Sequence, residues 1–207
     1  MELIDISPLV SERIGVWPGD VTYRRPVSLR VEDGHNFGLS SLATTVHLGA
    51  HADAPIHYVA GGRGIHEMPL THYYGPCQVV EVPVARGARI VPRDVAVALE
   101  APRVLFKSGT FPDPNDFTTD FASLSPELVE LVAARGGVLV GIDTPSVDPF
   151  DDKELLAHHA LARHGMANLE GLVLAHVPAG LYTLIALPLP LEGADASPVR
   201  AVLARDQ

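Results

Sequence analysis

The chain has 207 residues and a formal net charge of −10, with 47% apolar and 19% charged residues. This composition is typical of a folded globular protein, not of a disordered chain, and we expect one domain over residues 1–207. The acidic balance argues against nucleic acid and anionic membrane surfaces as partners, because no basic stripe is available to neutralise phosphates.

The N-terminal third of the chain has the features of β-structure with intervening loops. Gly and Pro separate its short segments, which lie at 3–7, 16–20, 27–31 and 39–49. A strand rich in β-branched residues is expected at 77–84, and Cys77 at its start is expected in the core. As the only cysteine, Cys77 can form neither an internal disulfide nor a cysteine-based zinc site, which fits a reducing cytoplasm.

Helices and strands alternate from residue 92 onward. We expect helices at 92–100, 125–135 and 151–165, and strands at 103–108, 138–143, 169–177 and 180–189. The second helix has the clearest boundaries, because Ser125 is a good N-cap, Pro126 suits the first turn and Gly136 ends the pattern. The pattern predicts an α/β fold built around one mixed sheet system.

Neither end of the chain predicts contact with a membrane. The N-terminal residues lack a basic region followed by an apolar core, so no secretory signal is expected. The longest apolar run lies near residue 185, is interrupted by Pro188 and Pro190, and is too short to span a bilayer. We therefore expect a cytoplasmic protein.

The segment VHLGAHADAPIH, residues 46–57, concentrates groups that bind metals. His47, His51, Asp53 and His57 have the same parity, and small or apolar residues separate them. On a helix these side chains would not converge, and Gly49 and Pro55 oppose a helix. In an extended chain they would point to one face, with the intervening alanines packed on the other.

Imidazole and carboxylate groups are the usual ligands of zinc and similar ions, and a hydrolytic site also needs a general base. Four such groups in eleven residues can supply three ligands and one base. The alternative interpretation is a set of surface histidines in a turn. Metal binding is favoured, because four polar groups share one parity among apolar neighbours.

These residues carry a resemblance to a known family. The signature H-x-G-[TA]-H-x-D-A-P-x-H of the metal-dependent cyclase-like hydrolases is matched at 47–57. Further segments resemble the bacterial kynurenine formamidase branch of that family in collinear order, at 3–7, 16–20, 75–82, 141–149, 157–174 and 184–203. The resemblance implies a swivelling β/β/α-type fold, a mixed sheet with flanking helices.

The resemblance also implies a site with two divalent metal ions, usually zinc. His47, His51 and Asp53 would hold the first ion, and Asp53 would bridge to the second. The site would be completed by His158 and Glu170. In addition, His57 would be the general acid/base and Trp17 would line the substrate pocket.

The choice of His158 depends on its spacing to Glu170, and the neighbouring His159 is the alternative ligand, because only one of the pair should face the site. His164 is expected at the surface or near the ligands. Asp143 and Asp148 follow a predicted buried strand, where functional groups often lie, but either could cap the turn. Neither is assigned a catalytic role.

The function implied is the hydrolysis of N-formyl-kynurenine to kynurenine and formate in tryptophan catabolism, by a water activated at the metal pair. A second interpretation keeps the metal core but changes the substrate to isatin or another cyclic amide. A third is a structural metal site in a non-enzymatic protein, which would have no use for His57 as a free base. The family resemblance further implies a homodimer.

Overall fold

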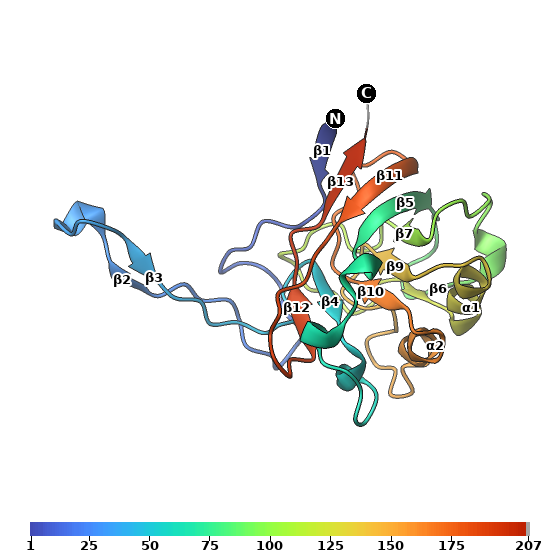
Figure 1. The fold of residues 1–207 in the computed structure, drawn as a ribbon, viewed down its shortest axis with the longest axis horizontal. Helices are drawn as coiled ribbons and strands as arrows, with labels where there is room; N and C mark the ends of the chain where they lie inside the picture. Colours follow the sequence, from blue (N-terminus) through green and yellow to red (C-terminus); the bar gives the residue numbers. More distant parts are fainter. Residues whose placement is uncertain (206–207) are drawn as a thin grey trace.

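A seven-stranded mixed sheet forms the centre of the computed structural model, which describes residues 1–205 (Figure 1). The strands lie in the order β1-β13-β11-β5-β7-β9-β10. Neighbours from β1 to β5 pair antiparallel, and neighbours from β5 to β10 pair parallel. The bounds are β1 Glu2–Asp5, β13 Val202–Arg205, β11 Gly180–Ile185, β5 Tyr74–Glu81, β7 Arg103–Lys107, β9 Leu139–Ile142 and β10 Ala167–Leu169.

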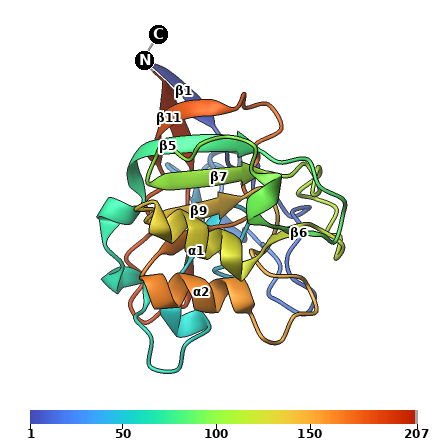
Figure 2. The same cartoon turned by 90° about the vertical axis from the view of Figure 1, so that its right-hand side faces the viewer.

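Two helices cover one face of the parallel half of this sheet. Figure 2 shows α1 (Pro126–Ala134) and α2 (Leu156–His164) side by side in front of β7 and β9. The strands present alternate apolar residues to them, so that Val80, Phe106 and Ile142 pack with the buried faces of the helices. Among residues 1–205 no helix is both long and apolar enough to cross a bilayer.

A short antiparallel ribbon packs against the other face of the sheet. It consists of β4 (His51–Asp53) and β12 (Ala196–Pro198). Three alanines, at 50, 52 and 54, are almost fully buried in the same cluster as Val79 and Leu105 of the sheet. Because alanine is small, β4 can lie close to the sheet while its polar side chains point the other way. The layers are therefore ribbon, sheet and helices, and the expected mixed sheet with flanking helices is confirmed.

A long hairpin extends away from this body (Figure 1). Within it, β2 (Val27–Leu29) and β3 (Leu39–Ser40) pair antiparallel, and none of residues 21–44 is buried. A smaller parallel pair, β6 (Arg89–Ile90) with β8 (Ser123–Leu124), lies beside the helices (Figure 2). Because β3 ends at Ser40, the strand expected at 39–49 is wrong beyond that residue.

Several predicted elements are confirmed with small shifts of their ends. The strands expected at 3–7, 77–84, 103–108, 138–143 and 180–189 correspond to β1, β5, β7, β9 and β11. Helix α1 begins as predicted, because the Ser125 hydroxyl oxygen accepts a hydrogen bond from the Leu128 N–H at 3.2 Å and Pro126 stands in the first turn.

The helix expected at 92–100 is wrong. Only a 3₁₀ turn forms, at Pro92–Asp94. After this turn, the side chain of Gln78 takes the place of helical hydrogen-bond partners. Its Nε2 donates to the Ala98 carbonyl at 2.9 Å, and its Oε1 accepts from the Glu100 N–H at 2.8 Å. A partner from a neighbouring strand thus determines the path of this segment.

Two other boundaries also differ from the prediction. The helix expected at 151–165 begins only at Leu156, after Leu155 adopts a φ of 47°. The strand expected at 169–177 ends at Leu169, because Gly171, with a φ of 64°, turns the chain away. Both deviations place polar side chains of this region, His158 and Glu170, at the same point of the fold.

Candidate metal centre

Three elements meet where the β4–β12 ribbon crosses the end of β10. β4 supplies His51 and Asp53, α2 supplies His158, and Glu170 follows β10 directly. Two main-chain hydrogen bonds fix this crossing: the His51 N–H donates to the Glu170 carbonyl at 3.1 Å, and the Glu170 N–H donates to the His51 carbonyl at 3.0 Å. The side chains of both residues are therefore held side by side.

These four side chains form a buried cluster, and each residue is at most 3% exposed. His51 Nε2 lies 3.3 Å from Glu170 Oε2 and 3.5 Å from Asp53 Oδ1. His158 Nε2 lies 3.2 Å from Asp53 Oδ2 and 3.4 Å from Glu170 Oε1. Carboxylate and imidazole atoms thus face one another without intervening apolar side chains.

His47 joins the cluster from a loop. Its Nδ1 lies 3.0 Å from Asp53 Oδ1. The donor atoms of these five residues therefore fall into two groups that could each hold an ion, His47 with His51 and Asp53, and Asp53 with His158 and Glu170. Asp53 belongs to both. His47 also belongs to a third such group, with His57 and Asp195. All five residues expected as ligands are brought together.

The expectation that residues 47–57 run extended with one parity is wrong in detail. Only His51–Asp53 is strand, and Gly49 turns the chain with a φ of 56°. A side chain at Gly49 would lie 2.9 Å from Pro8, so the turn requires glycine. His57 ends a 3₁₀ turn, Pro55–His57, instead of continuing the strand. The polar groups converge because the chain bends around the site.

The donor set fits divalent cations. Two neighbouring carboxylates, Asp53 and Glu170, are buried together, and Asp53 Oδ1 faces two imidazole nitrogens, His47 Nδ1 at 3.0 Å and His51 Nε2 at 3.5 Å. A buried carboxylate oxygen of this kind is costly unless a cation or a donor compensates it. Nitrogen and oxygen donors in these numbers suit zinc and similar ions.

Protonated histidines compensate the carboxylates when no cation does. Burial opposes protonation of His47, but the hydrogen bond and charge of Asp53 raise its pKa to about 9. Burial likewise opposes protonation of His158, whose pKa is nevertheless raised by Asp148, Asp53 and Glu170. Burial acts to raise the pKa of Asp53, and the hydrogen bonds of His158 and His47 outweigh it and lower that pKa.

The histidine rings are oriented by hydrogen bonds on their far nitrogens. His158 Nδ1 lies 2.8 Å from Asp148 Oδ2, and His51 Nδ1 lies 2.8 Å from the Gly49 carbonyl oxygen. Both rings thereby direct Nε2 into the cluster, as the outer partners of metal-binding histidines do. Asp148 is fully buried, accepts the N–H groups of Ala157 and His158, and also binds Arg89 at 2.8 Å. Asp148 therefore both caps the N–H groups of the first turn of α2 and positions the His158 ring.

Asn168 also supports the cluster. Its Nδ2 donates to Asp53 Oδ2 at 2.9 Å and to Glu170 Oε1 at 3.0 Å. The sequence interpretation did not identify this residue, and no motif marks it. Its position two residues before Glu170, in the same parity, is the only sequence signal that could have pointed to it.

The two neighbouring histidines of α2 lie in different environments. His158 is 2% exposed and contacts the cluster, whereas His159 is exposed on the outside of the helix. His164, at the end of α2, is exposed as well. Of the two alternatives left open by the sequence, the geometry therefore favours His158.

A cavity of about 540 Å³ opens beside the cluster and is lined in part by His47, His51, His57, His158 and Glu170. Trp17 also lines it. The indole stacks on Phe150 with ring centroids 4.8 Å apart and meets the edge of Phe117 at 5.7 Å. The cavity thus has both a polar wall and an aromatic wall.

Asp143 shapes another part of the cavity wall. Its carboxylate accepts hydrogen bonds from the N–H groups of Ser108 and Gly109 and from the Ser108 hydroxyl, at 2.7 to 3.1 Å. These bonds fix the loop that follows β7. Asp143 therefore anchors the main chain of the loop at Ser108 and Gly109, whereas Asp148 orients the imidazole ring of His158.

Comparison with known proteins agrees with this architecture. A predicted metal-dependent hydrolase from Bacillus stearothermophilus is 27% identical, with a TM-score of 0.82 over 98% of this chain and 97% of its own. A potential metal-dependent hydrolase with cyclase activity is also 27% identical, with a TM-score of 0.84 over 100% of this chain and 99% of its own.

The fold is shared more widely. Isatin hydrolase A from Labrenzia aggregata has a TM-score of 0.81 at 20% identity, over 99% of this chain and 94% of its own. Residues 4–149 match the family described as "Putative cyclase", a segment that contains the motif at 47–57 and ends just beyond Asp148. The chain belongs to this cyclase family.

Proposed function

We propose that the chain is a metal-dependent amidohydrolase in which two divalent ions are held by His47, His51, Asp53, His158 and Glu170. The observation that carries the proposal is the buried Asp53 carboxylate, which belongs to both groups of donor atoms formed by these residues. A carboxylate between two cations offsets their repulsion, and His and carboxylate ligands are those that zinc takes. Zinc is the proposed metal.

The proposed substrate is N-formyl-kynurenine, hydrolysed to kynurenine and formate in tryptophan breakdown. Its ring would contact the aromatic wall formed by Trp17 and Phe117, and its formyl group would reach the polar wall. A cavity of about 540 Å³ is within the usual range for a ligand of this size. The resemblance of the collinear segments to the kynurenine formamidase branch also supports this substrate.

Bound cations would polarise the formyl carbonyl and make a water molecule at the site easier to deprotonate. His57 lines the cavity beside the cluster, and its side chain is 36% exposed. As general base it would take the proton of the attacking water. It would then deliver that proton to the aryl nitrogen as the C–N bond breaks, so one group serves both halves of the reaction.

A second candidate is the hydrolysis of isatin or another cyclic amide. The likeness in fold to an isatin hydrolase favours it, and the same polar wall would serve both reactions because each breaks an amide C–N bond. A purely structural metal site is less well supported. Such a site closes its coordination, whereas this cluster borders a cavity and has the accessible His57 beside it.

The remaining features of the proposal concern the whole protein. We propose a single domain over 1–207 that acts in the cytoplasm as a homodimer, with a small molecule and not nucleic acid as its partner. The net charge of −10 supports the last point.

The test is hydrolysis by the purified, zinc-loaded protein. N-formyl-kynurenine and isatin are supplied separately, with and without a chelator, and each reaction is followed by absorbance. Turnover of the first that the chelator abolishes and added zinc restores is the expected result. Turnover of isatin alone would select the second candidate. If protein carrying two zinc ions turns over neither substrate, the hydrolase proposal is wrong.

A further inference from the structure

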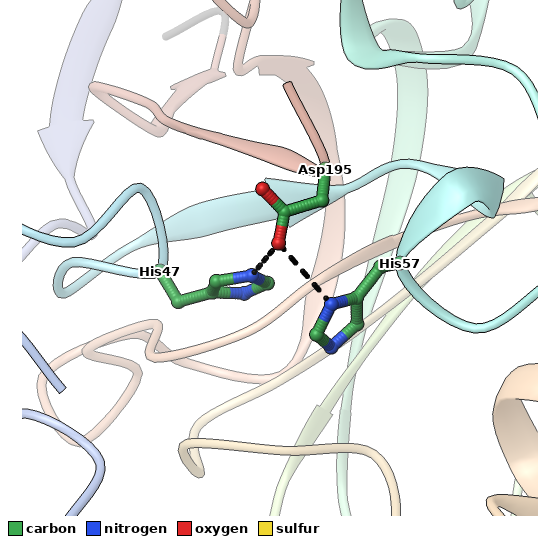
Figure 3. Close-up of side chains that lie close together, drawn as sticks. All are labelled: His47, His57 and Asp195. Carbon is green, nitrogen blue, oxygen red and sulfur yellow. Dashed lines mark hydrogen bonds and ion pairs between the residues drawn. The ribbon is translucent and has the colours of Figure 1, made fainter. Parts of the chain in front are cut away.

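Asp195 lies at the edge of the metal centre and contacts two histidines at once. It directly precedes β12, and the pairing of Ala196 with Asp53 places it next to the ligand strand. Figure 3 shows its carboxylate between the rings of His47 and His57. One oxygen, Oδ2, lies 3.0 Å from His47 Nε2 and 3.3 Å from His57 Nδ1.

Main-chain hydrogen bonds fix the backbone of Asp195 beside the ligand strand. The Asp195 carbonyl accepts the Ala54 N–H at 2.8 Å, and the ribbon pairing continues on the next residue. The two imidazole rings are themselves close, with centroids 4.4 Å apart. A residue contributed by the far end of the chain therefore reaches two of the three histidines of the motif that line the cavity, His47 and His57.

Each histidine presents a different nitrogen to Asp195. His47 turns Nε2 toward it and so keeps Nδ1 on Asp53. A carboxylate on the far nitrogen of a ligand histidine sets its tautomer and its orientation. His57 turns Nδ1 toward the same oxygen, which leaves Nε2 as the nitrogen free to exchange a proton.

We propose that Asp195 is a positioning residue that fixes both His47 and His57, the first as a metal ligand and the second as the acid/base. The role of His57 in this inference rests on the function proposed above. By holding the Nδ1–H tautomer of His57, Asp195 makes Nε2 the nitrogen that accepts the proton of water. Asp195 is not among the residues that line the cavity, so its effect is carried by the two imidazole rings.

The test compares Asp195→Ala and Asp195→Glu with the unchanged protein. Asp5→Asn is the matched control, since the Asp5 side chain is 42% exposed against 46% for Asp195 and pairs with Arg200, away from the site. The first readout is ¹⁵N–¹H NMR of the zinc-loaded protein, with the His57 signals assigned from a His57→Gln variant. The second is zinc affinity by chelator competition.

In the unchanged protein and in Asp5→Asn, His57 should carry its proton on Nδ1. In Asp195→Ala the proton should move toward Nε2, and zinc affinity should fall about 10- to 100-fold. If the Asp195→Ala protein is folded and neither the His57 tautomer nor zinc affinity changes, the inference is overturned.

Activity is the third readout. For Asp195→Ala, kcat for N-formyl-kynurenine should fall about 10- to 100-fold with KM nearly unchanged, and Asp195→Glu should recover part of the loss. If the unchanged protein hydrolyses no amide but the tautomer still moves in Asp195→Ala, the proposed function fails and the positioning role stands. If kcat is unaffected while the unchanged enzyme is active, the link to His57 is wrong.

Discussion

His57 marks the boundary between the buried cluster and the cavity. It contacts Asp195 and His47 but belongs to neither ligand group that contains Asp53. Replacement by Ala should therefore leave zinc bound and lower kcat about 10²- to 10⁴-fold, the usual contribution of a general acid/base. The measurement is kcat together with zinc content per chain.

His164→Ala is the control for that variant, because His164 is exposed at the end of α2 and should keep full activity. Loss of the bound zinc in His57→Ala would mean that His57 is a ligand. If kcat of His57→Ala is unchanged, His57 is not the general acid/base.

The protonation of the cluster predicts that zinc binding releases protons. Burial opposes the protonation of His47, yet Asp53 raises the pKa of this residue to about 9, so at neutral pH the metal-free protein holds a proton that zinc must displace. Apparent zinc affinity should therefore rise as pH increases toward about 9 and fall as pH decreases.

Calorimetric titration with zinc in buffers of different ionisation enthalpy measures the released protons directly. His47→Gln should release fewer protons than the unchanged protein. A binding enthalpy that is the same in every buffer would contradict the prediction.

At the residue scale the sequence predicts what is local. His47, His51, Asp53 and His57 are recognisable within eleven residues because their chemistry and parity stand out. Asn168 and Asp195 could not be found in this way. Asn168 lies 115 residues from Asp53, and Asp195 lies 148 residues from His47, so only the folded chain brings them together.

At the scale of elements, the crossing of the Gly49 turn and the segment after β10 decides where Glu170 lies. A Cβ on Gly171 would lie 2.1 Å from the Gly49 carbonyl oxygen, and Gly171 has a φ of 64°. Gly171→Ala should therefore destabilise the fold by more than the roughly 1–2 kcal/mol of the left-handed conformation alone. It should also displace Glu170 and weaken zinc binding.

Gly165→Ala is the matched control, because Gly165 has a φ of 62° and a Cβ at this position would have nothing within 4 Å. Urea unfolding of the two variants and of the unchanged protein gives the free energy of unfolding that each substitution costs. If both variants lose the same free energy of unfolding, the close approach of Gly171 to Gly49 does not contribute to stability.

The sequence predicts an element well when residues next to its ends determine where it begins and stops. Helix α1 has a capping hydroxyl and a proline within two residues of its start, so its position follows from Ser125 and Pro126. The segment 92–100 has helical composition, but Gln78 of β5 takes its hydrogen bonds. A contact from another strand outweighs local propensity there, and the segment alone carries no sign of it.

At the scale of the whole molecule, the alternation of helices and strands is enough to predict a mixed sheet, whereas no sequence pattern predicts that the hairpin of residues 21–44 extends away from the body of the fold. Its large apolar side chains are more than half exposed at Val31, Phe37, Leu39 and Leu42. A two-stranded ribbon has little stability on its own in water, so a surface that covered these side chains would stabilise the hairpin. A second copy of the chain would provide one and would account for the proposed homodimer.

Replacing Phe37 and Leu42 together by Ser should then shift the protein from dimer to monomer, because it removes apolar surface from the contact without altering the body of the fold. Sedimentation velocity over a range of protein concentrations measures the change. Val97→Ser with Leu181→Ser is the matched control, since these side chains are 53% and 54% exposed outside the hairpin. The control should stay dimeric. If the unchanged protein is already a monomer at micromolar concentration, the hairpin does not serve self-association and its apolar side chains need another partner.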